Sequence, residues 1–387
     1  MNDLNHNILV AKLRLIRSQN IGPITYYKLI EMFGDAGRAL EALPDLARRG
    51  GVKGGIRICS PDKAEQELER LEKVGGRMVC HTDPEYPTLL RHVEDAPPLI
   101  SVRGTLPKPE TKTVGIVGAR NASSNARCFA TRIARELGEA EYCVISGLAR
   151  GIDTAAHSGS IETGSVGVLG CGIDVVYPRE NAVLFDQMIE RGAIISEIPV
   201  GRSPQARFFP ARNRIIAGMS YGVVVIEAAV RSGTLITARL ALEQGREVFA
   251  VPGSPQDPRA RGSNNLIRQG ATVTEGIGDI TEIIDVMHPP TPVPKDSSQT
   301  PVIESDLFPT PPSSIDETNL SDDDNCSKPH DPHTLIEGLL NPTPISIDRI
   351  VRDTDLSTTQ VTMVLLEMEM SGMIERSPGN CVSLAGA

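Results

Sequence analysis

The sequence is poor in aromatic residues and has no tryptophan. Its 387 residues include six tyrosines and seven phenylalanines, so aromatic side chains account for only 3%. This scarcity argues against a fold whose main surface is a broad sheet of stacking aromatic rings. Hydrophobic residues nevertheless reach 40%, which excludes a wholly disordered chain. A chain of this length is expected to form two or three domains.

Patterns for metal binding, membrane insertion and export are also lacking. The seven cysteines are scattered, without a CxxC pair or a cysteine–histidine cluster, so no structural zinc site is expected. No run approaches about 18 uninterrupted apolar residues, so no membrane span is expected. The N-terminal residues include Asp3 and do not resemble a signal peptide. These absences predict a cytoplasmic protein with no metal and no cofactor.

Charge is distributed unevenly along the chain. The 39 lysines and arginines are outnumbered by 49 acidic residues, a formal charge of −10, which by itself argues against a nucleic-acid partner. Residues 288–332, however, contain ten of the 29 prolines, nine acids and two lysines, a net charge of −7. Proline and like charge both oppose compact structure, so this segment is predicted to be a disordered acidic linker. Residues 111–275 are slightly basic, and 17 of their 18 basic residues are arginine.

The N-terminal region, residues 1–80, is predicted to be a helical domain. Apolar residues recur at helical spacing in two runs, Leu9, Leu13 and Ile16, then Tyr26, Leu29, Ile30 and Phe33. Between them, Asn20-Ile21-Gly22-Pro23 predicts a turn whose proline begins the next helix. The turn is similar to that of a helix-hairpin-helix or sterile-alpha-motif-like element. Some such hairpins bind the DNA backbone through glycine amides, and a packing or partner-binding role is an equal alternative.

The middle region, residues 81–287, alternates short β-rich runs with helical patterns. This alternation indicates βαβ units and an α/β fold with a Rossmann-like, doubly wound parallel sheet. The expected strands are Thr113–Val117, Cys143–Ser146, Val166–Leu169, Ile194–Glu197, Gly222–Ile226 and Glu247–Val251.

The C-terminal region, residues 333–387, is predicted to be a winged helix. The expected helices are Pro332–Leu340, Ser346–Thr354 and Ser357–Ser371, with Ser346 and Ser357 as N-caps. Two short strands around a Pro-Gly-Asn turn follow, and three helices with such a hairpin are typical of a winged helix.

Two glycine-containing turns in the middle region each carry an arginine where a strand meets a helix. The first runs Gly118-Ala119-Arg120-Asn121-Ala122-Ser123, and the second runs Ser146-Gly147-Leu148-Ala149-Arg150-Gly151. In a Rossmann fold this position binds anions through backbone amides and the helix N-terminus. The GxGxxG fingerprint of dinucleotide sites is missing, because Arg120 and Ser123 stand where glycines are needed. An arginine instead offers a bidentate fork for phosphate.

Further polar residues follow these turns. Asp153 and His157 lie four residues apart on one helix face and can form a hydrogen bond that fixes the loop. The alternative is a hydrolase triad with Ser158 or Ser146, although the sequence has no GxSxG elbow. The run from Phe208 to Ala217 combines arginines, an amide and aromatic rings, the local chemistry of single-strand binding. Ser232 and Thr234 begin another helix, where they can cap it or donate to phosphate.

Together these motifs resemble the DprA/Smf family of bacterial DNA-processing proteins. The matching segments are GARNASSNA (118–126), SGLARGIDTAAH (146–157), GVLGCGIDVVYP (167–178), SEIP (196–199), FPARNRIIAG (209–218), VIEA (225–228), SGTLITARLALEQGR (232–246), FAVPGS (249–254) and NLIRQGA (265–271). The order of a helical domain, a Rossmann-like domain and a winged helix is also typical of the family. The acidic linker departs from it in composition.

The resemblance implies a DNA-binding protein with no catalytic residues. Such proteins bind incoming single-stranded DNA during natural transformation, protect it, and help load the RecA recombinase past single-strand-binding protein. It also implies a homodimer through the region of Asn264–Ala271. The motifs and the resemblance together give these candidate DNA-binding residues: Gly118, Arg120, Asn121, Ser123, Gly147, Arg150, Phe209, Arg212, Asn213, Arg214, Ser232 and Thr234.

Two other functions remain open from the sequence. The first is a nucleotide phosphoribohydrolase similar to the cytokinin-activating LOG enzymes. The loop at 231–237 lacks their double glycine and following catalytic glutamate, and Glu227 precedes it. The second is a regulator that reads duplex DNA through the helix at Ser357–Ser371. That helix carries Glu367 and Glu369 and has no lysine or arginine, which disfavours contact with phosphates.

Overall fold

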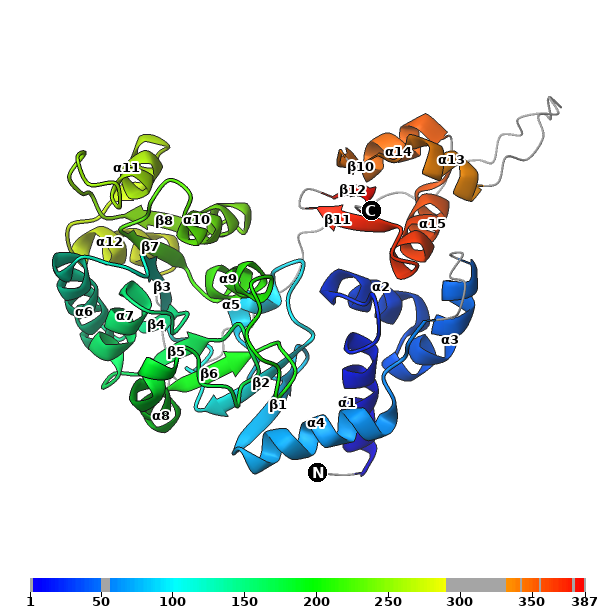
Figure 1. Cartoon of the computed structure of the whole chain (residues 1–387), viewed down its shortest axis with the longest axis horizontal. Helices are drawn as coiled ribbons and strands as arrows, with labels where there is room; N and C mark the ends of the chain where they lie inside the picture. Colours follow the sequence, from blue (N-terminus) through cyan, green and yellow to red (C-terminus); the bar gives the residue numbers. More distant parts are fainter. Residues whose placement is uncertain are drawn as a thin grey trace, which may run out of the picture.

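A computed structural model describes residues 3–49, 56–289, 332–341, 343–354, 356–377 and 380–385. Nearly all of the predicted acidic linker at 288–332 lies outside the described residues. The rest forms an N-terminal group of helices, a central α/β unit and a C-terminal winged helix (Figure 1). None of the helices in the described ranges combines the length and apolar character that crossing a bilayer requires.

The N-terminal helices follow the predicted apolar spacing. They are α1 (Asp3–Ile16), α2 (Pro23–Phe33), α3 (Ala36–Arg49) and α4 (Pro61–Lys73). As predicted, Pro23 occupies the first turn of α2, directly after Gly22 as N-cap, where its missing N–H has no helical partner to lose. Leu15, Leu29 and Leu43 are fully buried at the centre of this group.

The central sheet has nine strands in the order β1-β2-β6-β5-β4-β3-β7-β8-β9. Every neighbouring pair from β6 to β9 is parallel, which confirms the predicted Rossmann-like, doubly wound sheet. Its strands are β1 (Gly76–Cys80), β2 (Leu99–Gly104), β3 (Thr113–Gly118), β4 (Cys143–Ser146), β5 (Ser165–Val168), β6 (Ala193–Ser196), β7 (Gly222–Ile226), β8 (Glu247–Ala250) and β9 (Thr272–Val273).

One edge of the sheet differs from the sequence-based prediction. Strand β2 pairs antiparallel with β6, and β1 pairs antiparallel with β2. Strand β1 falls inside residues 1–80, where the sequence predicts helices, yet its residues belong to the sheet. The short edge strand β9 at the other end was also not expected from the sequence.

Helices cover both faces of the sheet. Residues of α6, α7 and α12 pack with Val114 and Ile116 of β3 on one face, while residues of α9 and α10 pack with Val117 on the other. Both faces of the parallel strands are therefore buried, and their sequences read as continuous apolar runs. The helices are α5 (Thr88–Arg91), α6 (Ser124–Glu139), α7 (Ile152–Ser160), η1 (Arg179–Asn181), α8 (Ala182–Arg191), α9 (Phe208–Gly218), α10 (Gly233–Glu243), α11 (Arg261–Arg268) and α12 (Gly278–Met287).

The C-terminal unit is the predicted winged helix. It contains α13 (Pro332–Leu339), β10 (Ile345–Ser346), α14 (Ile347–Thr354), α15 (Thr358–Met370), β11 (Ile374–Ser377) and β12 (Cys381–Leu384), with the strands in the order β10-β12-β11. Ser357 caps α15 in a capping box with Gln360, as its position before the helix predicts. Ser346 ends β10 immediately before α14.

The winged helix docks on the N-terminal helices through α15, which lies beside α3 (Figure 1). Leu366 and Met370 of α15 are fully buried in the apolar core of the N-terminal group. The Asn20 side-chain amide donates to the Met370 carbonyl at 3.0 Å, and the Thr25 hydroxyl donates to Glu369 at 2.9 Å. The hairpin turn at residues 20–23 therefore has a packing role within this chain.

Candidate nucleic-acid interface

The carboxyl ends of β3 and β7 form the topological switch point of the sheet. From β3 the chain adds β4, β5 and β6 on one side, and later β7, β8 and β9 on the other. Connections that leave a parallel sheet in opposite directions open a crevice there, which is the usual ligand site of such folds. Both predicted arginine turns leave strands at this edge.

The first turn presents Arg120 to solvent beside an aromatic ring. The guanidinium carbon of Arg120 lies 5.2 Å from the centroid of the Phe209 ring, a cation–π arrangement. Asn121 is exposed in the same turn. Gly118 ends β3 where a Cβ atom would lie 2.0 Å from the Ile226 carbonyl oxygen, so only glycine allows β3 to approach β7 this closely. The structure thus brings the predicted residues Arg120 and Phe209 together.

The N-terminus of α6 is already occupied by a carboxylate of the chain itself. The Ser123 backbone N–H donates to Glu227 at 2.8 Å, and the Ser123 hydroxyl donates to the same carboxylate at 2.6 Å. The hydroxyl also accepts from the Ala126 N–H as the N-cap of α6. A negative charge is favourable at a helix N-terminus, so Glu227 takes the place that the sequence suggests for phosphate.

The second turn packs directly on the first. The Ile152 N–H donates to the Ala119 carbonyl at 3.2 Å, and a Cβ atom on Gly151 would lie 2.3 Å from that same oxygen. Gly151 has a φ of +78°, a conformation that glycine adopts without strain. Arg150 is exposed at this turn and forms an ion pair with Glu180. The two predicted arginines therefore stand on touching turns.

Asp153 and His157 fix the local structure and face the interior. The Asp153 carboxylate accepts from the Ala149 N–H at 3.3 Å, and burial raises its pKa. The His157 Nδ1 atom pairs with the Ser165 hydroxyl at 2.8 Å, and burial lowers the pKa of His157 to about 3. Ser165 is 1% exposed and His157 is fully buried. A histidine and serine so enclosed cannot meet a substrate, and this arrangement stabilises α7 and its turn.

The two arginines of the run from Phe208 to Ala217 lie on different sides of α9. Arg212 is 5% exposed; it donates to the Val168 carbonyl at 2.8 Å and lies against Gly147, where a Cβ atom would be 1.6 Å from its Nη1. Burial is the main cause that lowers the pKa of Arg212. Arg214 lies on the opposite side of the helix, where it pairs with Glu197 and Asp95.

Arg212 is therefore buried against the second arginine turn, and the structure does not bring Arg214 to the crevice.

The remaining predicted residues hold loops together around the crevice. Ser232 is the N-cap of α10 and accepts from the Thr234 N–H at 3.2 Å. The Thr234 hydroxyl is buried and donates to the Gly118 carbonyl at 3.1 Å. The Asn213 side-chain amide donates to the Gly233 carbonyl at 3.3 Å. These bonds join α9 and α10 to the turn that carries Arg120.

Sequence reasoning missed Tyr177, which lies beside the predicted residues. Its ring centroid is 5.8 Å from that of Phe209, and the residue is 42% exposed. The loop that carries it is tied to the second arginine turn, because the Asn181 amide donates to the Leu148 carbonyl at 2.9 Å. The only sequence signal is a tyrosine before proline in a loop that follows a strand, which does not reveal its neighbours.

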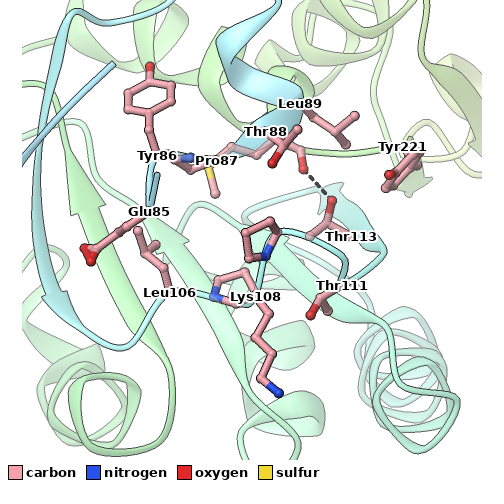
Figure 2. Close-up of a pocket in the computed structure, with 13 residues that line it drawn as sticks. Glu85, Tyr86, Pro87, Thr88, Leu89, Leu106, Lys108, Thr111, Thr113 and Tyr221 are labelled. Carbon is pink, nitrogen blue, oxygen red and sulfur yellow. Dashed lines mark hydrogen bonds between the residues drawn. The ribbon is translucent and has the colours of Figure 1, made fainter. Parts of the chain in front are cut away.

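A small cavity at the far end of β3 is distinct from this crevice. It has a volume of about 30 Å³ and lies between the residues around Tyr86 and Lys108, with Thr113, the first residue of β3, on its wall (Figure 2). That volume has room for only a few water molecules, so it cannot hold a nucleotide. Within the described ranges, no group of three or more metal-ligating side chains is arranged to hold an ion.

Comparison with known proteins agrees with this architecture. A family model described as DNA recombination-mediator protein A matches residues 77–285. The chain belongs to the DprA family. Two further models match this DprA family member, the DprA-like N-terminal HHH domain at residues 7–69 and the DprA winged helix domain at residues 323–380.

Individual relatives and a solved structure support the assignment. The protein Smf of Synechocystis sp. is 34% identical over 331 residues, which cover 81% of each chain. The DNA processing protein DprA of Bacillus subtilis is 41% identical over 241 residues, 62% of this chain and 81% of that protein. The X-ray structure of DprA from Streptococcus pneumoniae aligns with a TM-score of 0.58 at 32% identity, covering 71% of this chain and 97% of that one.

Proposed function

We propose that this DprA family member binds single-stranded DNA in the crevice at the carboxyl ends of β3, β4 and β7, without turning over nucleotides. The single observation that carries the proposal is the pair of exposed arginines, Arg120 and Arg150, on touching turns, with Arg120 over the Phe209 ring. Arginine forks suit phosphates, and aromatic faces suit unpaired bases. The matched family's description as a recombination mediator and the names of the relatives as DNA-processing proteins fit this chemistry.

The cellular role that follows is protection of incoming single-stranded DNA and help in loading the RecA recombinase during natural transformation. A protein that covers single strands without sequence preference suits both tasks. The test is the rate of RecA filament formation on DNA coated with single-strand-binding protein. We expect the protein to speed this rate, and no acceleration at any protein concentration contradicts the loading role.

Binding itself is tested with matched single-stranded and duplex oligonucleotides in fluorescence anisotropy over a series of salt concentrations. We expect tighter binding to the single strand, and affinity that falls as salt rises because counterions are released from phosphates. Equal affinity for both forms contradicts the proposal. A parallel assay follows nucleotide turnover. Release of free base from a nucleoside monophosphate, abolished by Glu227→Ala, favours a phosphoribohydrolase instead.

The proposed homodimer uses the edge of the sheet near Asn264–Ala271. A cavity of about 420 Å³ there is lined by Val230, Leu235 and residues of α11 such as Asn264 and Arg268. Val230 is 66% exposed, and Val273 of the edge strand β9 is 44% exposed. Light scattering of Val273→Asp, expected to be monomeric where the parent chain is dimeric, tests this interface. A parent chain that is already monomeric refutes it.

The winged helix fits a protein-contact role better than duplex recognition. Its helix α15 buries Val361 and Leu365 in the core of the winged helix and Leu366 and Met370 against the N-terminal helices. A helix covered on both sides is not free to enter a DNA groove. Its acidic residue Glu369 pairs with Arg376 at 2.8 Å.

A further inference from the structure

The tyrosine and phenylalanine rings that the structure describes are buried or half-buried, with Tyr177 as the one exception. Burial is the favoured state of a large ring, because exposing it to water forgoes the free energy of the hydrophobic effect. A lone exposed tyrosine needs no explanation. Tyr177, however, stands at the crevice that carries the exposed arginines, 5.8 Å from Phe209.

Phe209 is not free to offer its ring to a base. The Arg120 guanidinium lies over it, Gly170 packs against it so closely that a Cβ atom there would lie 3.0 Å from the ring, and Tyr177 flanks it. Phe209 therefore orients Arg120 and supports Tyr177. The open aromatic surface at this end of the crevice belongs to Tyr177.

We propose that Tyr177 is the stacking platform for an unpaired base, while Arg120 holds the adjoining phosphate. This assignment rests on the proposed binding of single-stranded DNA and names a contact that neither the motifs nor the comparisons provide. Tyr177 would contact the π face of a nucleobase, and because every base has such a face, the contact does not depend on the DNA sequence. The loop that bears Tyr177 is anchored to the second arginine turn through Asn181 and Leu148, so the platform is held in place before DNA arrives.

The first test compares Tyr177→Ala and Tyr177→Phe in the full chain, using oligodeoxythymidylate in fluorescence anisotropy. We expect Tyr177→Ala to weaken binding by about 5- to 150-fold, the range for removing one stacking ring. Tyr177→Phe keeps the ring and should stay within about twofold of the parent chain. Val183→Ala is the matched control, because Val183 is a nearby apolar residue on α8 that is 72% exposed.

Salt dependence separates stacking from charge. Loss of a stacked base should leave the slope of log affinity against log salt unchanged, whereas Arg120→Ala should reduce it by about 0.7, the value for one phosphate on a single strand. An oligonucleotide with abasic sites should bind the parent chain more weakly, and Tyr177→Ala should not weaken its binding further. The first of these two measurements tests the stacked base on the parent chain, and the second assigns the contact to Tyr177.

The outcomes distinguish this inference from the function on which it rests. If Arg120→Ala loses affinity while Tyr177→Ala binds like the parent chain, the stacking role is wrong and the DNA-binding crevice stands. If Tyr177→Ala binds abasic and normal oligonucleotides with equal losses, Tyr177 acts through the fold and the stacking role is again wrong. If the parent chain shows no preference for single strands, the proposed function and the stacking role both fail.

Discussion

Replacement of Arg120 by alanine tests the crevice most directly. Its side chain is exposed and makes a cation–π contact with Phe209. Such an exposed contact contributes about 0.5–1 kcal/mol to the free energy of unfolding. A charge-assisted hydrogen bond to phosphate contributes about 1.5–3 kcal/mol to binding. Arg120→Ala should therefore weaken binding to single-stranded DNA by about 10- to 150-fold and hardly change thermal unfolding.

Arg214→Ala, on the other side of α9, is the control variant, because it should change stability and leave DNA affinity unchanged. Arg214 is 10% exposed, donates to the Asp95 carbonyl at 2.7 Å and pairs with Glu197, which is 15% exposed. Its removal leaves a mostly buried carboxylate unpaired, at a cost of up to about 3–5 kcal/mol in the free energy of unfolding. We expect the folded fraction of Arg214→Ala to keep its DNA affinity.

Two assays on the same preparations decide the comparison, DNA anisotropy and thermal unfolding. Arg120→Lys keeps the charge and loses the bidentate fork, so it should recover only part of the lost affinity. If Arg120→Ala instead lowers the melting temperature while its DNA affinity stays intact, Arg120 stabilises the loop and does not bind DNA. That result would refute the reasoning that places it in the binding crevice.

Three further predictions follow from other contacts. Glu180→Gln removes the exposed ion partner of Arg150, so Arg150 becomes free to bind phosphate. Single-strand binding in the same anisotropy assay should become tighter by about 1.5- to 5-fold, the equivalent of ~0.2–1 kcal/mol. Unchanged or weaker binding contradicts this prediction. Leu366→Ala should cost about 2–5 kcal/mol in thermal unfolding, and hydrogen exchange should show lost protection in the N-terminal helices as well as in the winged helix, because Leu366 is fully buried between them. The hydrogen bond from Lys112 lowers the pKa of Asp285. The ionised Asp285 therefore stabilises the fold above about pH 4, and this contribution is lost as the pH falls through the lowered pKa. The difference in melting temperature between the parent chain and Asp285→Asn should shrink in acid, and a constant difference down to roughly pH 2 to 3 would contradict the pairing.

The sequence by itself determined the features that depend on neighbours along the chain. The predicted bounds of β4 and β7 match the structure to the residue, because continuous apolar β-branched runs between polar turns have few other ways to be buried. The start of α2 at Pro23 and the capping box at Ser357 follow from local backbone chemistry. Arg120 and Arg150 lie in the turns that follow β3 and β4, as the sequence predicts, and the carboxyl ends of these parallel strands share one edge of the sheet.

Only the tertiary structure decided which arginines stay in water. Arg212 and Arg214 are two residues apart in one basic run, but residues at that spacing on a helix point to nearly opposite sides. Arg212 is therefore bonded to the Val168 carbonyl, whereas Arg214 pairs with carboxylates from distant segments. The antiparallel strands β1 and β2 likewise depend on long-range pairing, which outweighs weak local preferences. Tyr177 meets Phe209 across a separation of 32 residues, and α15 meets the N-terminal helices from the other end of the chain. Contacts of this kind are set by packing in three dimensions, which no local pattern of residues encodes.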